Sequence, residues 1–358
     1  ENMVTKVFEK DYYASVQGRQ HNGVLAENPV LIEITRGDMV ESVHRGTYVV
    51  IADTGNVLSF SGDIDKLMYP RSSLKPLQAI PLIETGAADH WNLGTPELAL
   101  TCASHNGEKR HVDTVLGWLA RIGLSEDSLG CGSQAPSDRE SRRQLILQQS
   151  EPGRRHHNCS GKHAGFLSTA RYLREPSNGY LDIEHPTQIR VKQVVKEMTS
   201  ENLDTNPVGV DGCGAPIFGV SLRGLGLGMA RYGTGFGLSQ VRATATSRLY
   251  SAMTEQPFMV AGTGRWCTKT MTLTGPRLVV KGGAEGVYCG TVPGNRTGIA
   301  VKIDDGGSRA AEAVMGLLLA RFADLDSELA AELRNLALPP IFNSNGLKVG
   351  TTRVSGDI

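Results

Sequence analysis

The stretch Pro70-Arg71-Ser72-Ser73-Leu74-Lys75 stands where strand-like sequence gives way to helix-like sequence. Before it, short apolar runs within residues 30–60 are separated by turn residues, which predicts an antiparallel meander. After it, apolar residues recur on one helix face, as in 112–122. A helix that begins near Ser72 places the side chains of Ser72 and Lys75 on one face, within reach of each other.

Strand-like sequence returns near the other end of the chain. Three such runs lie within 277–303, and the apolar spacing of 308–322 predicts a long helix after them. One antiparallel sheet assembled from both chain ends, with a helical lobe inserted, is an α+β architecture. The predicted parts of this single catalytic unit are an N-terminal extension (1–27), a sheet lobe (28–71 and 272–358) and a helical lobe (72–271).

The Ser-x-x-Lys spacing of Ser72 and Lys75 suggests a catalytic pair. A serine hydroxyl is a poor nucleophile until a base takes its proton. A lysine that is buried, or close to another cation, can be that base in its neutral form. The spacing alone is weak evidence, because a helix-capping serine beside a solvated lysine produces it too.

Two further motifs strengthen the catalytic interpretation. Ser104-His105-Asn106 follows in the helical region, and Lys281-Gly282-Gly283 lies in the late strands. Glycines there allow the edge of the sheet to approach a substrate closely. The three motifs resemble, in chain order, the Ser-x-x-Lys, Ser-Asp-Asn and Lys-Thr-Gly set of serine β-lactamases and penicillin-binding proteins. They predict a serine β-lactamase-like fold.

A third cluster spans residues 156–163 and holds three histidines, a cysteine and a lysine, and Cys213 lies further on in a Gly-rich turn. Two thiolates with one or two nitrogen ligands suit tetrahedral zinc. The paired-cysteine spacing of zinc fingers is absent, so buried cysteines beside surface histidines are the alternative interpretation. The six cysteines of the chain are too scattered for a disulfide framework.

Composition argues against several classes of partner. Lys plus Arg and Asp plus Glu each number 37, so the formal net charge is zero. No charge surplus points to nucleic acid or to an anionic membrane, and a small, near-neutral substrate fits better. No apolar stretch is long enough to span a membrane, and residues 1–29 lack the apolar core of a secretory signal. We therefore expect a cytoplasmic protein.

Five sequence blocks together resemble the rhizobial-type (class 3) L-asparaginases. The resemblance extends over roughly residues 28–350, and several blocks in order are more specific than any single motif. It implies a serine β-lactamase-like fold, a homodimer and the hydrolysis of L-asparagine to L-aspartate and ammonia. The blocks are Val-Glu-Ser-Val-His-Arg-Gly (40–46), Pro-Arg-Ser-Ser-Leu-Lys-Pro (70–76), Cys-Ala-Ser-His-Asn-Gly-Glu (102–108), Asn-Cys-Ser-Gly-Lys-His (158–163) and Val-Asp-Gly-Cys-Gly-Ala-Pro (210–216).

The resemblance also implies catalytic residues. The family carries two Ser-Lys tandems. One matches Ser72 with Lys75, and the other matches Ser104 with a lysine on a late strand, for which Lys281 is the candidate. In this interpretation Lys75 takes the proton of Ser72, which then attacks the side-chain amide of asparagine. Ser104 and Lys281 protonate the departing ammonia.

A zinc ion is implied in the same way. The family's zinc is held by two cysteines and a lysine, and these match Cys159, Lys162 and Cys213. A lysine ligand must be neutral, so the metal has to lower the pKa of that lysine strongly. Spacing alone favours His163 over Lys162 as the nitrogen ligand.

Selection of a zwitterionic substrate requires fixed charges. Arg71 is the candidate partner of the α-carboxylate through a bidentate contact, and Asp211 is the candidate partner of the α-ammonium. The alternative for each is a structural ion pair. Asn158 and His163, from the block that holds the predicted zinc ligands, are further predicted substrate-binding residues.

Two other functions compete with this one. A β-lactamase or D,D-peptidase would also use a serine nucleophile activated by lysine, but the metal cluster and the lack of a secretory signal argue against this function. A non-catalytic zinc-binding or amino-acid-binding protein on the same fold would bind asparagine without releasing ammonia.

Overall fold

The computed structural model describes residues 27–356 and 358, so the predicted N-terminal extension lies outside the described residues except for Glu27. Within the described part, the largest sheet has eight strands, all paired antiparallel. Their order is β11-β12-β1-β2-β10-β9-β8, with β3 paired to β2. The strands are β1 (Val30–Arg36), β2 (Met39–Ala52), β3 (Val57–Ser61), β8 (Val279–Gly282), β9 (Val287–Val292), β10 (Thr297–Ile303), β11 (Pro340–Phe342) and β12 (Lys348–Val354).

The long strand β2 organises this sheet. Its first half pairs with β1, and its second half lies between β3 and β10. Residues 46–51 of β2 are all buried, although successive strand residues point to opposite faces, so both faces must be covered. The helices α10 (Leu222–Thr234) and α14 (Ser308–Phe322) both pack against β2 and β10. The close approach of α10 requires Gly298, because a Cβ there would lie 2.0 Å from the carbonyl oxygen of Gly226.

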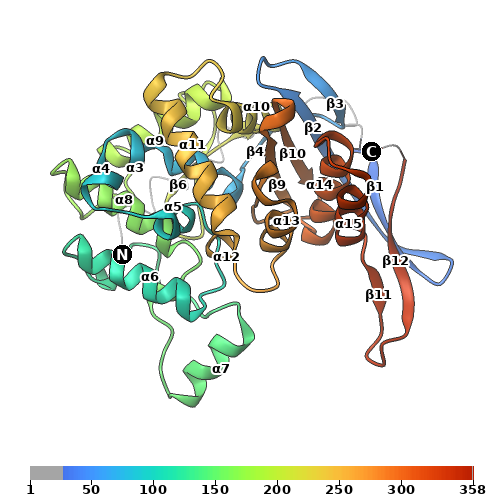
Figure 1. The fold of residues 1–358 in the computed structure, drawn as a ribbon, viewed down its shortest axis with the longest axis horizontal. Helices are drawn as coiled ribbons and strands as arrows, with labels where there is room; N and C mark the ends of the chain where they lie inside the picture. The colour runs from blue at the N-terminus through green and yellow to red at the C-terminus, as the bar shows by residue number, and fades with distance from the viewer. Residues whose placement is uncertain (1–26, 357) are drawn as a thin grey trace, which may run out of the picture.

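The middle of the chain forms the helical lobe, which lies beside the sheet lobe in Figure 1. A 3-10 turn, Arg71–Leu74, leads into it, and α15 (Ser327–Ala337) packs on α14 in the sheet lobe. Two separate two-stranded sheets accompany the helices. They are β4 (Leu67–Met68) with β7 (Val220–Ser221), and β5 (Val208–Val210) with β6 (Pro216–Phe218). The remaining helices are α2 (Lys75–Gln78), α3 (Ile80–Glu84), α4 (Ala87–His90), α5 (Thr95–Thr101), α6 (Lys109–Arg121), α7 (Arg139–Leu147), α8 (Ser160–Tyr172), α9 (Pro186–Thr199), α11 (Gln240–Glu255), α12 (Pro257–Val260) and α13 (Trp266–Thr274).

The predicted α+β class is confirmed. Strands from both chain ends lie side by side in one antiparallel sheet, as the register of Ile32 with Val354 shows, and the helices come from the chain between them (Figure 1). The predicted helix over 112–122 corresponds to α6. At the lobe boundary the structure differs in detail, because the 3-10 turn precedes the α-helix, which begins at Lys75 rather than near Ser72.

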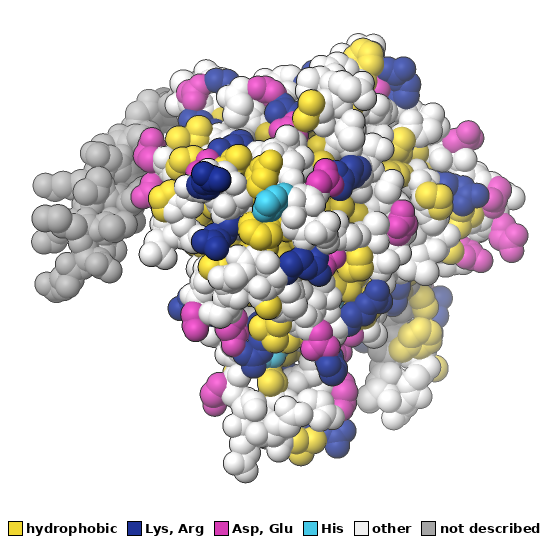
Figure 2. Space-filling model, turned by 60° about the vertical axis from the view of Figure 1, so that its left-hand side comes forward, with side chains coloured by type: hydrophobic (Ala, Val, Ile, Leu, Met, Phe, Trp, Pro, Cys, Tyr) yellow, Lys and Arg dark blue, Asp and Glu magenta, His cyan; other side chains and the backbone are white. Residues whose placement is uncertain are grey.

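The surface carries both signs of charge. On the face turned to the viewer in Figure 2, Lys and Arg side chains are interspersed with Asp and Glu and with small apolar areas. This mixture agrees with the zero formal net charge. Among residues 27–356, no helix has both the length and the apolar character needed to cross a membrane.

Candidate active site

The hydroxyl of Ser104 lies between two lysines. Lys75 Nζ donates to Ser104 Oγ at 3.0 Å and to the carbonyl oxygen of Ala103 at 2.5 Å. Lys281 Nζ donates to the same Oγ at 2.9 Å and to the carbonyl oxygen of Gly282 at 2.6 Å. Three residues far apart in the sequence therefore meet at one oxygen atom.

Each member of this trio is fixed by its own element. Lys75 is the first residue of α2, directly after the 3-10 turn. Ser104 follows α5 in a loop that is held by a backbone hydrogen bond from its N–H to the carbonyl oxygen of Val260, 3.0 Å away. Lys281 lies on β8, at the end of the sheet's strand order, where it is paired with Cys289 of β9. The site thus forms at the junction of the two lobes.

The two lysines are withdrawn from solvent. The exposed fraction is 0% for Lys75 and 2% for Lys281. Burial, with the nearby charge of Lys75 as a second cause, lowers the pKa of Lys281 to about 7. Because both effects penalise the ammonium form, a substantial fraction of Lys281 is a neutral amine near pH 7. A neutral amine can accept the hydroxyl proton of Ser104.

Ser72 faces the same space as Ser104. Both serines line a cavity of about 220 Å³, together with Gly282 at the end of β8 and Gly283 and Ala284 of the β8–β9 turn. The volume is suited to a ligand the size of a small amino acid. Within the described residues the Ser72 hydroxyl has no hydrogen bond to Lys75, whose amine is turned to Ser104 instead. The neighbouring Ser73 is buried and donates to the carbonyl oxygen of Pro70 at 2.6 Å, so it is not a competing nucleophile.

The backbone around Ser72 is tightly constrained. Arg71 has a φ of 51°, a left-handed conformation that costs a non-glycine residue free energy and is often found at functional sites. A Cβ at Gly283 would lie 2.8 Å from the carbonyl oxygen of Pro70 and 3.0 Å from the N atom of Ser73. The β8–β9 turn therefore presses against the start of the helical lobe, and only glycine allows that approach.

The predicted zinc ligands also lie together. Lys162 Nζ donates to Cys213 Sγ at 3.1 Å, and Cys159, Lys162 and Cys213 are all buried. A hydrogen bond with Cys213, with the cations of Lys75 and Lys162 as further causes, overcomes burial and lowers the pKa of Cys159 well below its ordinary value. Burial opposes the charge on Lys162, but its interactions with Cys213 and Cys159 raise its pKa. The cluster is a buried arrangement of two cysteines and a lysine.

The chemistry of this donor set fits a zinc ion. Two thiols and an amine are suitable ligands once the amine loses its proton. His163 contributes a further nitrogen nearby: its Nε2 is buried and has no hydrogen-bond partner among the described residues, and burial lowers the pKa of the ring to about 4. Over the described part of the chain, no group of three or more His, Cys, Asp or Glu residues is arranged to hold a metal. The predicted zinc ligands include only two residues of these types, Cys159 and Cys213, so Lys162 would have to be the third ligand.

Of the four predicted substrate-binding residues, three lie away from the cavity that holds Ser72 and one lines it. Arg71 Nε donates to Asp211 Oδ1 at 2.8 Å, so these two charges neutralise each other, and neither residue lines the cavity that holds Ser72. His163 is buried and its Nδ1 lies 2.6 Å from the Tyr180 hydroxyl. Asn158 alone of the four lines the cavity, with its amide donating to Gln134 at 3.1 Å.

Several cavity residues have no signal in the sequence. Arg265 lies directly before α13, Tyr288 lies on β9, and Ser308 and Glu312 lie on α14. All come from segments whose local pattern indicates only ordinary strands and helices. A residue of this kind becomes visible only when the sheet lobe is folded against the helical lobe.

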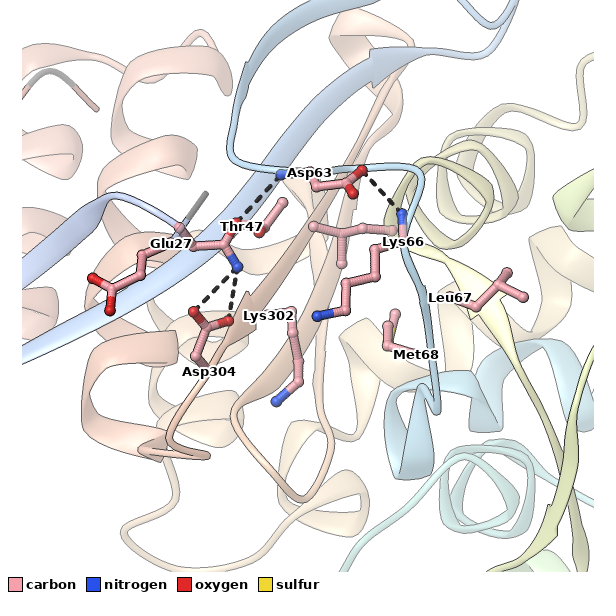
Figure 3. Close-up of a pocket in the computed structure, with 10 residues that line it drawn as sticks. Glu27, Thr47, Asp63, Lys66, Leu67, Met68, Lys302 and Asp304 are labelled. Carbon is pink, nitrogen blue, oxygen red and sulfur yellow. Dashed lines mark hydrogen bonds between the residues drawn. The ribbon is translucent and has the colours of Figure 1, made fainter. Parts of the chain in front are cut away.

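A second cavity, of about 340 Å³, lies apart from the serines and is shown in Figure 3. Its wall includes Lys66, Lys302 and Asp304, and Asn28 donates to both carboxylate oxygens of Asp304. Lys302 Nζ donates to the carbonyl oxygen of Glu285 at 2.6 Å, in the β8–β9 turn. This lysine therefore supports the turn that carries Gly283, behind the reaction cavity.

Comparison with known proteins identifies a family. Residues 32–354 match the family model described as L-asparaginase II. No curated protein matches the chain significantly. Similar solved structures include a β-lactamase (Mb2281c) from Mycobacterium bovis, at 14% identity and a TM-score of 0.38 over 78% of this chain and 95% of that one. A putative β-lactamase from Bacteroides dorei is similar at 13% identity and a TM-score of 0.43 over 78% and 93%.

Proposed function

The chain belongs to the L-asparaginase II family, and we propose that it hydrolyses the side-chain amide of L-asparagine to L-aspartate and ammonia with a serine nucleophile activated by lysine. The observation that carries this proposal is the Ser104 hydroxyl held between two buried lysines, beside Ser72, at one cavity of about 220 Å³. A hydroxyl in this position can receive a proton from one amine and pass its own proton onward.

In the proposed mechanism Ser72 is the nucleophile. Its Oγ attacks the amide carbon, and its proton passes through Ser104 to a neutral lysine amine, for which Lys281 with its pKa of about 7 is the better candidate. Ser104 gives its proton to the amide nitrogen and is reprotonated by a lysine, so the C–N bond breaks and ammonia leaves. Water then attacks the resulting β-aspartyl ester and gives up a proton to a lysine, and Ser72 regains its own proton as L-aspartate is released.

The tetrahedral oxyanion needs hydrogen-bond donors. The N–H of Gly283 is unsuitable, since it donates to the carbonyl oxygen of Val287 at 2.7 Å. The N–H groups of Ser72 and Ala284, both cavity residues, are the proposed donors. They approach the cavity from the two lobes, and the close contact at Gly283 holds them in place.

Cys159, Lys162 and Cys213 are the residues that would hold a zinc ion in this site. The ion would supply a Lewis-acidic charge that shapes and orients the pocket, while Ser72 provides the nucleophile. Because Lys162 has a raised pKa beside the thiolates, binding of the metal would have to displace the lysine proton. Zinc affinity should therefore fall as pH falls.

We also propose that the protein is a homodimer, as the family resemblance implies. The strands β1, β2, β11 and β12 project from the sheet lobe (Figure 1). Apolar side chains are exposed on β2, on β11 and in the turn between β11 and β12, and such exposure is typical of protein interfaces. The exposed residues there are Met39, Val40, Val43, Phe342 and Leu347. Light scattering coupled to size-exclusion chromatography, compared with a Met39→Glu, Phe342→Glu variant, tests this assignment.

The activity itself is tested by ammonia release from L-asparagine, L-glutamine and D-asparagine, with nitrocefin as a β-lactam substrate. We expect turnover of L-asparagine and none of nitrocefin. Nitrocefin hydrolysis without amide hydrolysis would favour the β-lactamase alternative. Calorimetric binding of asparagine without ammonia release would favour a binding protein.

A further inference from the structure

Two residues of opposite charge lie on the wall of the cavity that holds the serines. Arg265 and Glu312 line the same cavity as Ser72 and Ser104. Within the described residues these two side chains form no salt bridge with each other or with other charged groups, unlike Arg71 and Asp211. They also border an adjoining cavity of about 350 Å³. A cation and an anion therefore line the cavity of the proposed nucleophile without a salt bridge, close enough for the charge of Arg265 to act on Glu312.

Arg265 is held in place by the sequence block that contains Ser104. Its Nη1 donates to Asn106 Oδ1 at 3.1 Å. The orientation of the Asn106 amide is set by its Nδ2, which donates to the carbonyl oxygen of Thr263 at 3.1 Å and to Glu108 Oε1 at 3.3 Å. Asn106 is buried, so this support is rigid.

Glu108 fixes the loop that carries Arg265. Its carboxylate accepts the N–H of Thr263 at 2.7 Å and the Thr263 hydroxyl at 2.7 Å. Gly262, with a φ of 110°, lies so close that a Cβ there would be 2.4 Å from Glu108 Oε1. The block 102–108 thus places Ser104 between the lysines and also holds Arg265 at the cavity wall.

Glu312 is less accessible than Arg265. It is half-buried on α14 beside Tyr288, whose hydroxyl lies 3.1 Å from Cys267 Sγ. Burial raises the pKa of Glu312, and the Arg265 guanidinium opposes that shift. The carboxylate therefore carries a desolvation cost that an ammonium group of a ligand would relieve.

We propose that Arg265 binds the α-carboxylate and Glu312 the α-ammonium of the amino-acid substrate, with Asn106 as the residue that positions Arg265. This inference rests on the proposed function and specifies its substrate class as a zwitterion bound by both charged groups. A guanidinium suits a carboxylate geometrically, and an unpaired carboxylate suits an ammonium. The Arg71–Asp211 pair is already internally satisfied and then has a structural role.

Three amide substrates separate the two contacts. L-Asparagine carries both charges, succinamate lacks the ammonium, and 3-aminopropanamide lacks the carboxylate. Arg265→Gln should lower kcat/KM by about 10- to 100-fold for L-asparagine and succinamate and leave 3-aminopropanamide unchanged. Glu312→Gln should show the complementary pattern, with losses for L-asparagine and 3-aminopropanamide only. Asn106→Ala should reproduce the Arg265 pattern more weakly, mainly in KM.

Controls identify the source of any loss. Lys269→Gln removes a cation of α13 that lines the adjoining cavity but not the cavity of the serines, and it should change the three values far less than Arg265→Gln does. Arg71→Gln and Asp211→Asn test the rival pair. Equal losses for all three substrates in the Arg265 and Glu312 variants, or the charge-matched pattern in the Arg71 and Asp211 variants, would overturn the inference.

Binding measurements keep the inference separate from the proposed activity. Calorimetric titration with L-aspartate, succinate and β-alanine measures the same contacts without turnover. If the wild-type protein releases no ammonia, the proposed function fails, and the titrations still decide the head-group assignment. Loss of L-aspartate and succinate binding in Arg265→Gln, with β-alanine binding retained, supports it. Unchanged affinities contradict it.

Discussion

Lys75 and Lys281 share one hydrogen-bond acceptor: each directs its amine at Ser104 Oγ, at 3.0 and 2.9 Å. Two ammonium groups this close repel each other; both lysines are buried, and each has a backbone carbonyl oxygen as a further acceptor. The low-dielectric surroundings strengthen that repulsion, so a state with one neutral amine is favoured. In the proposed mechanism, that neutral amine is the group that accepts a proton from serine.

The first prediction assigns the nucleophile. Ser72→Ala should lower kcat by about 10³-fold or more, because no other group forms the ester. Ser104→Ala should slow turnover but still form the ester. Peptide mapping by mass spectrometry, after reaction with an electrophilic diazoketone analogue of asparagine, identifies the modified serine. Modification of Ser104 in place of Ser72 would show that the two roles are exchanged.

The second prediction concerns the pH profile. The pKa of Lys281 is about 7, so the rate should rise with pH through that value as the neutral amine forms. Lys281→Met should lower the rate and remove the limb near pH 7. Measured kcat/KM between pH 5 and pH 10 tests this expectation. A limb near pH 5 that persists in the variant would point to a carboxylate or histidine base.

The third prediction concerns stability and follows from the same lysine. In the unfolded chain a lysine pKa is about 10.4, and folding lowers that of Lys281 to about 7. The unfolded state therefore binds the proton more tightly, and the contribution of Lys281 to stability becomes more favourable as pH rises from 7 towards 10. At pH 6 the Lys281→Met variant should melt about 3 °C or more above the wild type. That difference should shrink by pH 10. A pH-independent difference would contradict the assigned pKa.

The fourth prediction concerns the metal cluster. Protein purified without chelators should contain about one zinc per chain by elemental analysis, and Cys159→Ala or Cys213→Ala should reduce that content. Cys131→Ala is a matched control, since Cys131 is also a buried free cysteine. A metal-free preparation with full activity would rule out zinc as part of the native site.

The fifth prediction tests the contact between the lobes. Gly283→Ala should push the β8–β9 turn away from Ser73 and lower kcat by about 10- to 100-fold, because small misplacements of reacting groups are costly. Gly294→Ala is the control, since no atom lies within 4 Å of the Cβ it would add. Circular dichroism should show both variants folded. Equal activity of the two variants would mean that the turn does not position the site.

The sequence predicts the fold well for a physical reason. The apolar patterns near both chain ends mark strands, and the motifs at Ser72, Ser104 and Lys281 lie on the elements that the fold brings together. The pairing of lysine with serine could not be predicted in the same way. A spacing of three residues suggested a contact of Ser72 with Lys75, but the 3-10 turn and the burial of Lys75 direct its amine to Ser104.

The partners of the charged residues are harder to predict from the sequence than the strands and helices are. Arg71 and Asp211 belong to distinctive motifs, and the sequence cannot show that they neutralise each other. Arg265 and Glu312 belong to no motif, because their position depends on how α13 and α14 pack against the helical lobe. The support of Arg265 by Asn106, 159 residues earlier in the chain, has no local sequence pattern at all.

Because the sheet contains strands from both chain ends, it cannot be completed until the C-terminal strands have been synthesised. Ser104 and Lys281 are 177 residues apart, so the serine leaves the ribosome about 10–35 s before the lysine does. During that interval β1 and β2 lack their partner strands β12 and β10. Their apolar edges therefore stay unpaired unless chaperones shield them. A nascent chain that already carries Ser72, Lys75 and Ser104 therefore lacks the second lysine of the candidate site until Lys281 has been synthesised.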